Sequence, residues 1–313
     1  MPEPPTGLVL RIDAKVCHVE VDGQRKLVPL RGRLFEDRAH ARNPVAVGDR
    51  VILSGENHDA IDEVLPRSTA LARRAKGEEN REQVIAANVS RVLVVSAARE
   101  PALQPLLIDR ILASCARQDL CAEVVFTKVD QDQRGELAEW VELYRSIGYP
   151  VHCTCVLPGR ETTAELEVLR ELIHSNLTVL TGLSGAGKSS LLNVLVPGLA
   201  LRVGEVNRVR HGRHTTTAAE LFPLPRGGHV LDTPGIRNFV LYGVAPTELT
   251  FWFREFPQVA ANCAYRNCSH LGEPDCAVLR AVADGRIHAS RHASYRQLHE
   301  ELTEADSRER RGR

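Results

Sequence analysis

Residues 177–195 read Leu177-Thr-Val-Leu-Thr-Gly182-Leu-Ser-Gly-Ala-Gly187-Lys188-Ser189-Ser190-Leu-Leu-Asn-Val-Leu195. The apolar run at the start predicts a buried strand, and the run after Lys188 predicts a helix. The turn between them has the spacing of a phosphate-binding loop, in which backbone N–H groups and a helix N-terminus face phosphate oxygens. The residues expected to contact a nucleotide are Gly182, Leu183, Ser184, Gly185, Ala186, Gly187, Lys188, Ser189 and Ser190.

Two side chains of this loop carry the expected chemistry. Lys188 is expected to reach the β- and γ-phosphates and so to act in catalysis, and the Ser189 hydroxyl is expected to coordinate magnesium. The alternative interpretation is a glycine-rich turn that binds nothing. The strand before the loop and the helix after it favour the phosphate loop.

The residues around the loop alternate between strands and helices from residue 84 to about residue 240. Continuous apolar runs at 90–96, 122–126, 151–155 and 229–232 predict strands that are buried on both faces. Helical spacing predicts helices at 106–117, 135–147 and 164–175. This alternation indicates an α/β domain with a parallel sheet.

Two further motifs follow predicted strands. Asp232-Thr-Pro-Gly235 comes after the last strand, so Asp232 is expected to hold magnesium through water and Gly235 to contact a γ-phosphate. Thr127-Lys128-Val129-Asp130 resembles the guanine-recognition motif, which usually begins with Asn. The Asp130 carboxylate can accept two hydrogen bonds from guanine, worth about 1.5–3 kcal/mol each, and adenine offers no such pair. Thr127 is shorter than Asn, which predicts a weaker tether to the phosphate loop.

The regions outside the α/β domain have different patterns. Residues 1–70 contain short β-rich runs with Asp22-Gly23 as a hairpin signal, which predicts a small β-barrel of OB type. Residues 69–83 are rich in charge and are expected to form a linker or mobile loop. Residues 241–313 are expected to be helical, with helices at 245–262, 277–283 and 289–304.

A cluster of metal ligands lies in the C-terminal region. Three thiols and one imidazole form a complete tetrahedral set for one structural zinc ion, with no position left for catalysis. The alternative is a disulfide with a spare thiol. The expected ligands are Cys263, Cys268, His270 and Cys276, and the other cysteines are expected to be small buried apolar residues.

The base-recognition segment precedes the phosphate loop in this chain, and that order resembles the RsgA/YjeQ family of circularly permuted GTPases, which act in assembly of the small ribosomal subunit. Residues 47–50 resemble the end of the family's OB-fold, residues 85–89 its entry to the GTPase domain, and residues 212–217 its switch I. The resemblance implies an RNA-binding OB-fold barrel (1–70), a permuted P-loop GTPase domain (84–240) and a zinc-binding helical domain (241–313). It also implies docking on the small subunit and its rRNA, GTP hydrolysis stimulated there, and zinc at the four ligands.

The catalytic machinery departs from that of Ras-like enzymes at one position. Ile236 stands where they place a water-orienting Gln, so unaided hydrolysis is expected to be slow. His214 is the candidate group that orients water, and the resemblance implies a catalytic role for it. Thr216, or else Thr215, is expected to complete the magnesium shell.

Composition limits the remaining choices. Forty basic residues balance forty acidic ones, which argues against a polycation that coats nucleic acid, although Arg31, Arg33, Arg38 and Arg42 could contact phosphates locally. No run approaches the roughly 18 apolar residues of a membrane span. A cytoplasmic monomer is expected. The rival functions are an ATP-using P-loop enzyme and an RNA-binding zinc adaptor with a degenerate nucleotide site.

Overall fold

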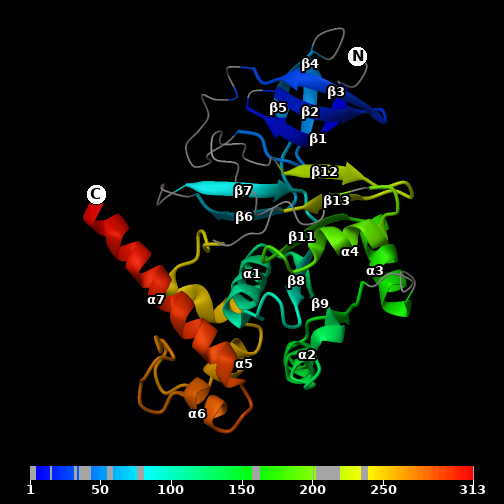
Figure 1. Cartoon of the computed structure of the whole chain (residues 1–313). Helices are drawn as coiled ribbons and strands as arrows, with labels where there is room; N and C mark the ends of the chain where they lie inside the picture. The colour runs from blue at the N-terminus through cyan, green and yellow to red at the C-terminus, as the bar shows by residue number, and fades with distance from the viewer. Residues whose placement is uncertain are drawn as a thin grey trace, which may run out of the picture.

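The computed structural model of the chain describes residues 5–14, 16–31, 34, 44–54, 59–75, 81–156, 163–199, 201, 219–233 and 239–312. Figure 1 shows a β-barrel near the N-terminus, a central sheet flanked by helices, and a helical module that ends in one long helix. No helix within these residues is both long and apolar enough to cross a membrane.

Five antiparallel strands form the N-terminal barrel. They are β1 (Thr6–Asp13), β2 (Val16–Val21), β3 (Gln24–Pro29), β4 (Arg50–Ser54) and β5 (Ala60–Val64). Strand β1 pairs with β2 and β4, β2 pairs with β3, β4 pairs with β5, and a bridge from Leu30 to Ile61 closes the ring. Alternate residues point inward, so Val9, Val19, Val28 and Val51 are fully buried. The hairpin predicted at Asp22-Gly23 is present, and both residues have the positive φ of a tight turn.

A two-stranded hairpin comes between the barrel and the central sheet in the sequence. Its strands are β6 (Ala70–Arg74) and β7 (Glu82–Ala87), which pair with each other in antiparallel fashion. The linker predicted for 69–83 is therefore wrong at both of its ends. The charged side chains dominated the composition of this stretch, whereas Leu71, Ala72 and Ala86 are buried and hold the hairpin in place.

The central sheet has the strand order β10-β9-β8-β11-β13-β12, and β12 also pairs with β1 of the barrel. The parallel strands are β8 (Arg91–Ala97), β9 (Cys121–Thr127), β10 (Val151–Cys153), β11 (Leu177–Gly182) and β13 (His229–Asp232). Strand β12 (Glu220–Pro223) runs antiparallel to β13 and is too short to stand out in the sequence. Because parallel strands end at one edge, Thr127, Gly182 and Asp232 meet there.

Helices cover both faces of this sheet. On one face, Val92, Val94 and Val124 pack against α1 (Pro105–Arg117) and α2 (Leu137–Ser146). On the other face, Leu93, Val95 and Val125 pack against α3 (Ala164–His174) and α4 (Lys188–Leu195). Successive residues of β8 and β9 therefore face opposite helical layers, as continuous apolar strands require.

The C-terminal module consists of the 3₁₀ helix η4 (Pro246–Trp252), α5 (Phe256–Ala260), α6 (Ala277–Ala283) and α7 (Ala289–Gly312). The single helix predicted at 245–262 is wrong, because the chain is extended at Phe253 between η4 and α5. Pro257 lies in the first turn of α5, where its missing N–H needs no partner. Phe253, Phe256 and Tyr295 are buried against one another at the centre of the module.

Candidate nucleotide site and metal cluster

The phosphate loop connects β11 to α4, and two glycines allow its path. Gly182 has a φ of +145°, and a Cβ at this position would lie 2.0 Å from the Val95 carbonyl oxygen on β8. Gly187 has a φ of +87°, and its Cβ would lie 3.3 Å from Oγ1 of Thr127. Side chains at these positions would separate the loop from the neighbouring strands, so the glycines fix the shape of the loop.

Lys188 begins α4 and is buried. Its Nζ donates hydrogen bonds to the carbonyl oxygens of Gly182, at 3.1 Å, and of Leu183, at 2.8 Å. Burial lowers the pKa of this ammonium group, while the nearby Asp232 carboxylate acts in the opposite direction. The positive charge is therefore held inside the loop on which phosphate is expected to bind.

Ser189 and Asp232 form a second polar contact at the same edge of the sheet. The Ser189 hydroxyl donates to Oδ2 of Asp232 at 2.7 Å. Oδ1 of Asp232 is buried and has no hydrogen-bond partner within the described part of the chain. Burial raises the pKa of Asp232, against the effects of Ser189 and Lys188. A hydroxyl beside a carboxylate with a spare buried oxygen suits magnesium, which prefers oxygen ligands.

The segment after β9 is hydrogen-bonded directly to the phosphate loop. Buried Thr127 donates from Oγ1 to the Ala186 carbonyl oxygen at 2.5 Å. Lys128, with a φ of +55°, donates from Nζ to the carbonyl oxygens of Gly185, at 2.8 Å, and of Glu100, at 2.6 Å. The shorter threonine side chain thus reaches the loop, and Lys128 adds a second tether on the same side.

Asp130 has a partner that sequence reasoning missed. The Cys155 thiol donates to Oδ1 of Asp130 at 2.9 Å. Cys155 comes just after β10, where Thr154 still pairs with Phe126 and Val129 through backbone hydrogen bonds. Residue spacing gave no signal for this contact, because it depends on the pairing of β10 with β9.

Other expected nucleotide contacts lie outside the described residues. These are His214, Thr215, Thr216 and Gly235. Thr233, the last described residue before Gly235, is buried. Its backbone N–H and its Oγ1 both donate to the Leu180 carbonyl oxygen, at 3.2 and 2.8 Å, and so anchor this residue to β11.

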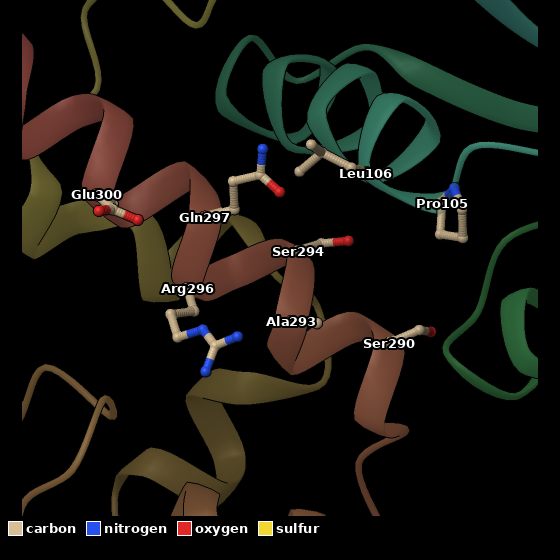
Figure 2. A pocket seen from close by; sticks show the side chains of 8 residues that line it. All are labelled: Pro105, Leu106, Ser290, Ala293, Ser294, Arg296, Gln297 and Glu300. Atoms are coloured by element: carbon tan, nitrogen blue, oxygen red, sulfur yellow. The ribbon is translucent and has the colours of Figure 1, made fainter.

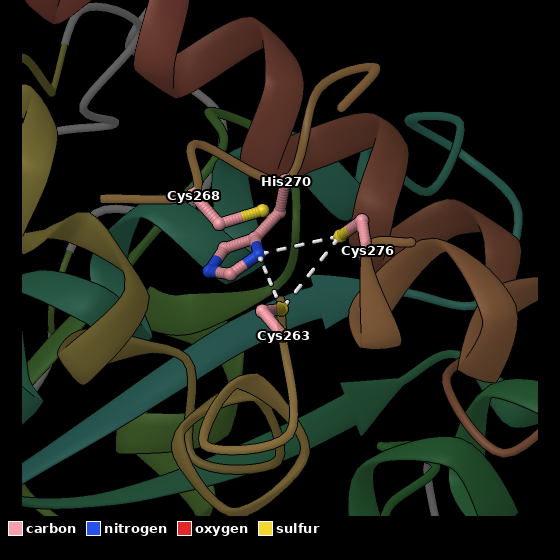
Figure 3. A group of neighbouring side chains, drawn as sticks. All are labelled: Cys263, Cys268, His270 and Cys276. Atoms are coloured by element: carbon pink, nitrogen blue, oxygen red, sulfur yellow. Dashed lines mark hydrogen bonds between the residues drawn. The ribbon is translucent and has the colours of Figure 1, made fainter. Parts of the chain in front are cut away.

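The four predicted metal ligands lie together in the C-terminal module (Figure 3). Their ligand atoms all fall within 4.8 Å of one another. Nδ1 of His270 is 3.6 Å from the Cys263 sulfur and 3.5 Å from the Cys276 sulfur, and these two sulfurs are 3.9 Å apart. A disulfide requires about 2.05 Å between sulfurs, and all three cysteines are free thiols.

The surroundings of the cluster favour a bound cation. The backbone N–H of Ala277 points at the Cys263 sulfur at 3.3 Å, as suits a thiolate. Burial lowers the pKa of His270, which keeps its imidazole in the neutral form that a metal needs. Burial also raises the pKa of Cys268 to about 12, so a cation is required to hold that thiol ionised. The donor set therefore fits a four-coordinate metal ion.

Known proteins resemble this chain over nearly its whole length. A family model described as RsgA GTPase matches residues 64–242. A protein of Gemmatimonas aurantiaca named small ribosomal subunit biogenesis GTPase RsgA is 38% identical over 303 residues, covering 95% of this chain and 97% of that one. A Chlorobaculum parvum protein of the same name is 36% identical and covers 97% of this chain and 100% of its own length.

Solved structures agree with this relationship. The crystal structure of YjeQ from Thermotoga maritima matches with a TM-score of 0.74 and 31% identity, covering 96% of this chain and 98% of that one. YloQ, described as a circularly permuted GTPase, matches with a TM-score of 0.68 and 27% identity, covering 97% and 96%. The fold class predicted from the sequence, a permuted GTPase domain between a β-barrel and a helical metal-binding module, is confirmed. The chain belongs to the RsgA family of GTPases.

Proposed function

We propose that this chain hydrolyses GTP to GDP and phosphate during late maturation of the small ribosomal subunit, and that the subunit stimulates hydrolysis. The relatives carry the name small ribosomal subunit biogenesis GTPase. The observation that carries the proposal is the pair of hydrogen bonds from Thr127 and Lys128 to the phosphate loop, which join the segment of Asp130 to that loop. Because these bonds hold the two segments together, they support the proposal that Asp130 contacts the base of a nucleotide bound on the loop.

Hydrolysis forms a bond from a water oxygen to the γ-phosphorus and breaks the bond from that phosphorus to the bridging oxygen of GDP. Lys188 and the N–H groups of the loop stabilise the negative charge on the phosphate oxygens. Ser189 and Asp232, with Thr216 or Thr215, are the residues that would hold magnesium. When bound, magnesium neutralises charge on the β- and γ-phosphates.

His214 is proposed as the residue that orients the attacking water. Ile236 offers no polar group for this task, and His214 lies in the segment expected to form switch I. Gly235 is proposed to contact the γ-phosphate through its backbone N–H. These roles rest on sequence and family membership.

The Cys263, Cys268, His270 and Cys276 cluster is proposed to bind one zinc ion. Three sulfurs and one imidazole nitrogen at tetrahedral spacing suit zinc better than magnesium or calcium, which prefer oxygen ligands. Zinc, when bound, supplies folding free energy to the module.

We propose that the chain has three domains with different roles, at the boundaries expected from the sequence: 1–70, 84–240 and 241–313. The barrel is proposed to contact rRNA. Arg31 is half-exposed and forms an ion pair with Asp62 at 3.3 Å, whereas Arg33, Arg38 and Arg42 lie outside the described residues.

A cytoplasmic monomer fits a protein that works on ribosomal subunits.

The proposal is tested by measuring GTP turnover with and without purified small ribosomal subunits. Slow turnover alone and a large increase with small subunits are expected, with no increase from large subunits. Lys188→Ala is the matched control and should show no GTP turnover, either alone or with small subunits. Equal turnover under all conditions would reject stimulation by the subunit, and turnover that Lys188→Ala retains would reject this site.

A further inference from the structure

The metal-binding segment brings its ligands together through a tight turn at His270. Cys268 lies two residues before it, and His270 has a φ of +61°, a left-handed conformation that side chains other than glycine rarely adopt. Figure 3 shows the imidazole pointing from this turn toward the sulfurs of Cys263 and Cys276. The turn therefore has to be held in place for Cys268 and His270 to face the other two ligands.

The carboxylate of Glu273 binds the N–H groups on both sides of this turn. Its Oε1 accepts from the backbone N–H of Ser269 at 2.6 Å and also from the Ser269 hydroxyl. Its Oε2 accepts from the backbone N–H of Leu271 at 3.1 Å and of Gly272 at 3.2 Å. Backbone N–H groups gathered around a left-handed residue form a concave site that favours an anion. Here the anion is a side chain of the same segment, and His270 lies between its donors.

The charge on Glu273 strengthens these hydrogen bonds. Burial acts to raise the pKa of this carboxyl group, but the hydrogen bonds from Ser269 and Gly272 outweigh it and hold the pKa well below its usual range. Hydrogen bonds to an ionised acceptor are stronger than those between neutral groups. The turn is therefore fixed by a carboxylate that stays ionised.

Helix α7 binds the carbonyl groups of the same turn. The Tyr295 hydroxyl donates to the Ser269 carbonyl oxygen at 3.1 Å, and Nε2 of His292 donates to the His270 carbonyl oxygen at 2.8 Å. Glu273 thus holds the donors of the turn, and α7 holds its acceptors.

Helix α7 is itself fixed to α1, and side chains of both helices line a groove of about 440 Å³ (Figure 2). Arg291 of α7 donates to Oδ1 of Asp109 on α1 at 2.6 Å, and both side chains are almost completely buried. The next residue of α1, Arg110, donates to Oε1 of Glu301 on α7 at 2.7 Å and to the Phe239 carbonyl oxygen at 3.0 Å. Because a buried ion pair is costly to break, α7 is a fixed support for one side of the turn.

We propose that Glu273 is a positioning residue for the metal cluster. It holds the turn at His270 in its left-handed form, so that Cys268 and His270 face Cys263 and Cys276 before a metal ion binds. This role requires no contact between Glu273 and the ion. The inference rests on the proposed zinc site and goes beyond it, because it assigns part of the metal affinity to a residue outside the four ligands.

The test compares Glu273→Ala and Glu273→Gln with the unaltered protein. Zinc affinity is measured by competition with a chromophoric chelator, and cobalt(II) is substituted for zinc to record the ligand-field bands of the site. Glu273→Ala should bind zinc about ten- to a hundredfold more weakly, the usual effect of removing a residue that orients metal ligands. Its cobalt bands should shift, because the turn that carries His270 is released. Glu273→Gln keeps one acceptor oxygen and should fall between the two proteins in both measurements.

Two controls separate positioning from charge and from stability. Asp275→Asn removes a negative charge from the same segment, where the carboxylate is 78% exposed and pairs with Arg280 at 3.8 Å. Its zinc affinity should stay within about twofold and its cobalt bands should not move, since Asn tolerates the φ of +57° at this position. Val278→Ala removes part of a fully buried side chain of α6, so it should lower the Tm and leave the cobalt bands at their original wavelengths.

Two results would overturn the inference. The first is unchanged zinc affinity in Glu273→Ala. The second is weaker zinc binding with the cobalt bands of the unaltered protein, as expected for Val278→Ala, which would give Glu273 a purely structural role. If Glu273→Ala does not fold, Glu273→Gln decides alone by the same two measurements. Failure of the proposed zinc site is a separate result, because the unaltered protein would then contain no zinc and show no ligand-field bands of four-coordinate cobalt.

Discussion

The thiol of Cys155 donates a hydrogen bond to Oδ1 of Asp130 over 2.9 Å, joining the chain after β10 to the carboxylate expected to recognise guanine. A carboxylate on an exposed turn can rotate, and a fixed donor on one oxygen limits that rotation. Cys155 is therefore expected to help orient Asp130 toward the base.

The first prediction concerns this contact. Cys155→Ser keeps a donor and should keep GDP affinity within about twofold. Cys155→Val removes the donor and should weaken GDP binding about fivefold, as loss of about 1 kcal/mol implies. Calorimetric titration with GDP measures both. Equal affinities in Ser and Val variants would show that the thiol does not orient Asp130.

The second prediction separates stability from function at Asp232. Burial raises the pKa of this carboxyl group, so the folded state holds its proton to a higher pH than the unfolded state does. Stability from this group is fully present below the unfolded pKa and is lost as pH rises through the folded pKa. Asp232→Asn should therefore raise the Tm of the nucleotide-free protein at neutral pH, because the neutral amide does not have to bury a charge.

The gain from Asp232→Asn should shrink in acid, where the unaltered carboxyl group is already protonated. In the presence of magnesium, the same variant should bind GTP less tightly than the unaltered protein, because an amide is a poorer magnesium ligand than a carboxylate. Thermal melts at several pH values, with and without magnesium and GTP, measure both effects. A Tm below that of the unaltered protein at neutral pH would contradict the prediction.

The third prediction concerns His214. His214→Ala should abolish most subunit-stimulated turnover while leaving GDP affinity unchanged, because an orienting group for water contributes to the transition state and not to nucleotide binding. Single-turnover hydrolysis with small subunits measures this. Stimulated turnover at the unaltered rate in His214→Ala would assign water orientation to another group.

The fourth prediction concerns the metal cluster. Elemental analysis should find one zinc ion per chain, and Cys263→Ser or Cys276→Ser should lose it together with the helical signal of the C-terminal module. Cys121→Ser is the matched control, because Cys121 is exposed on β9, where burial was expected from the sequence, and lies far along the chain from the cluster. Full zinc content in both cluster variants would contradict the assignment of these ligands.

The sequence predicted the features that are set by residues close together along the chain. The phosphate loop at Gly182 to Ser189 and the strands around it are visible in the sequence because each is a continuous run with its own spacing. The four predicted ligands from Cys263 to Cys276 are likewise close in sequence and meet in space.

Features that depend on distant partners could not be predicted in this way. Strands β6 and β7 are recognisable once Leu71 and Ala86 are seen to be buried, and the charged residues between them hid that fact. Phe253 packs on Tyr295 of another helix, which fixes where the break lies, although Pro257 marks the start of α5 in the sequence itself. The contacts of Cys155 with Asp130 and of Arg110 with Phe239 and Glu301 join segments far apart in sequence, and no spacing rule announces them.

Recognition of guanine is assigned to Asp130, beside the phosphate loop. Competition for labelled GDP by GTP, GDP and ATP, measured in parallel for the unaltered protein and Asp130→Asn, is the decisive measurement. GTP and GDP should displace the label, ATP should compete at least about tenfold more weakly, as loss of one charge-assisted hydrogen bond implies, and Asp130→Asn should lose most of that difference. Equal competition by ATP in the unaltered protein, or an unchanged preference in Asp130→Asn, would contradict the claim.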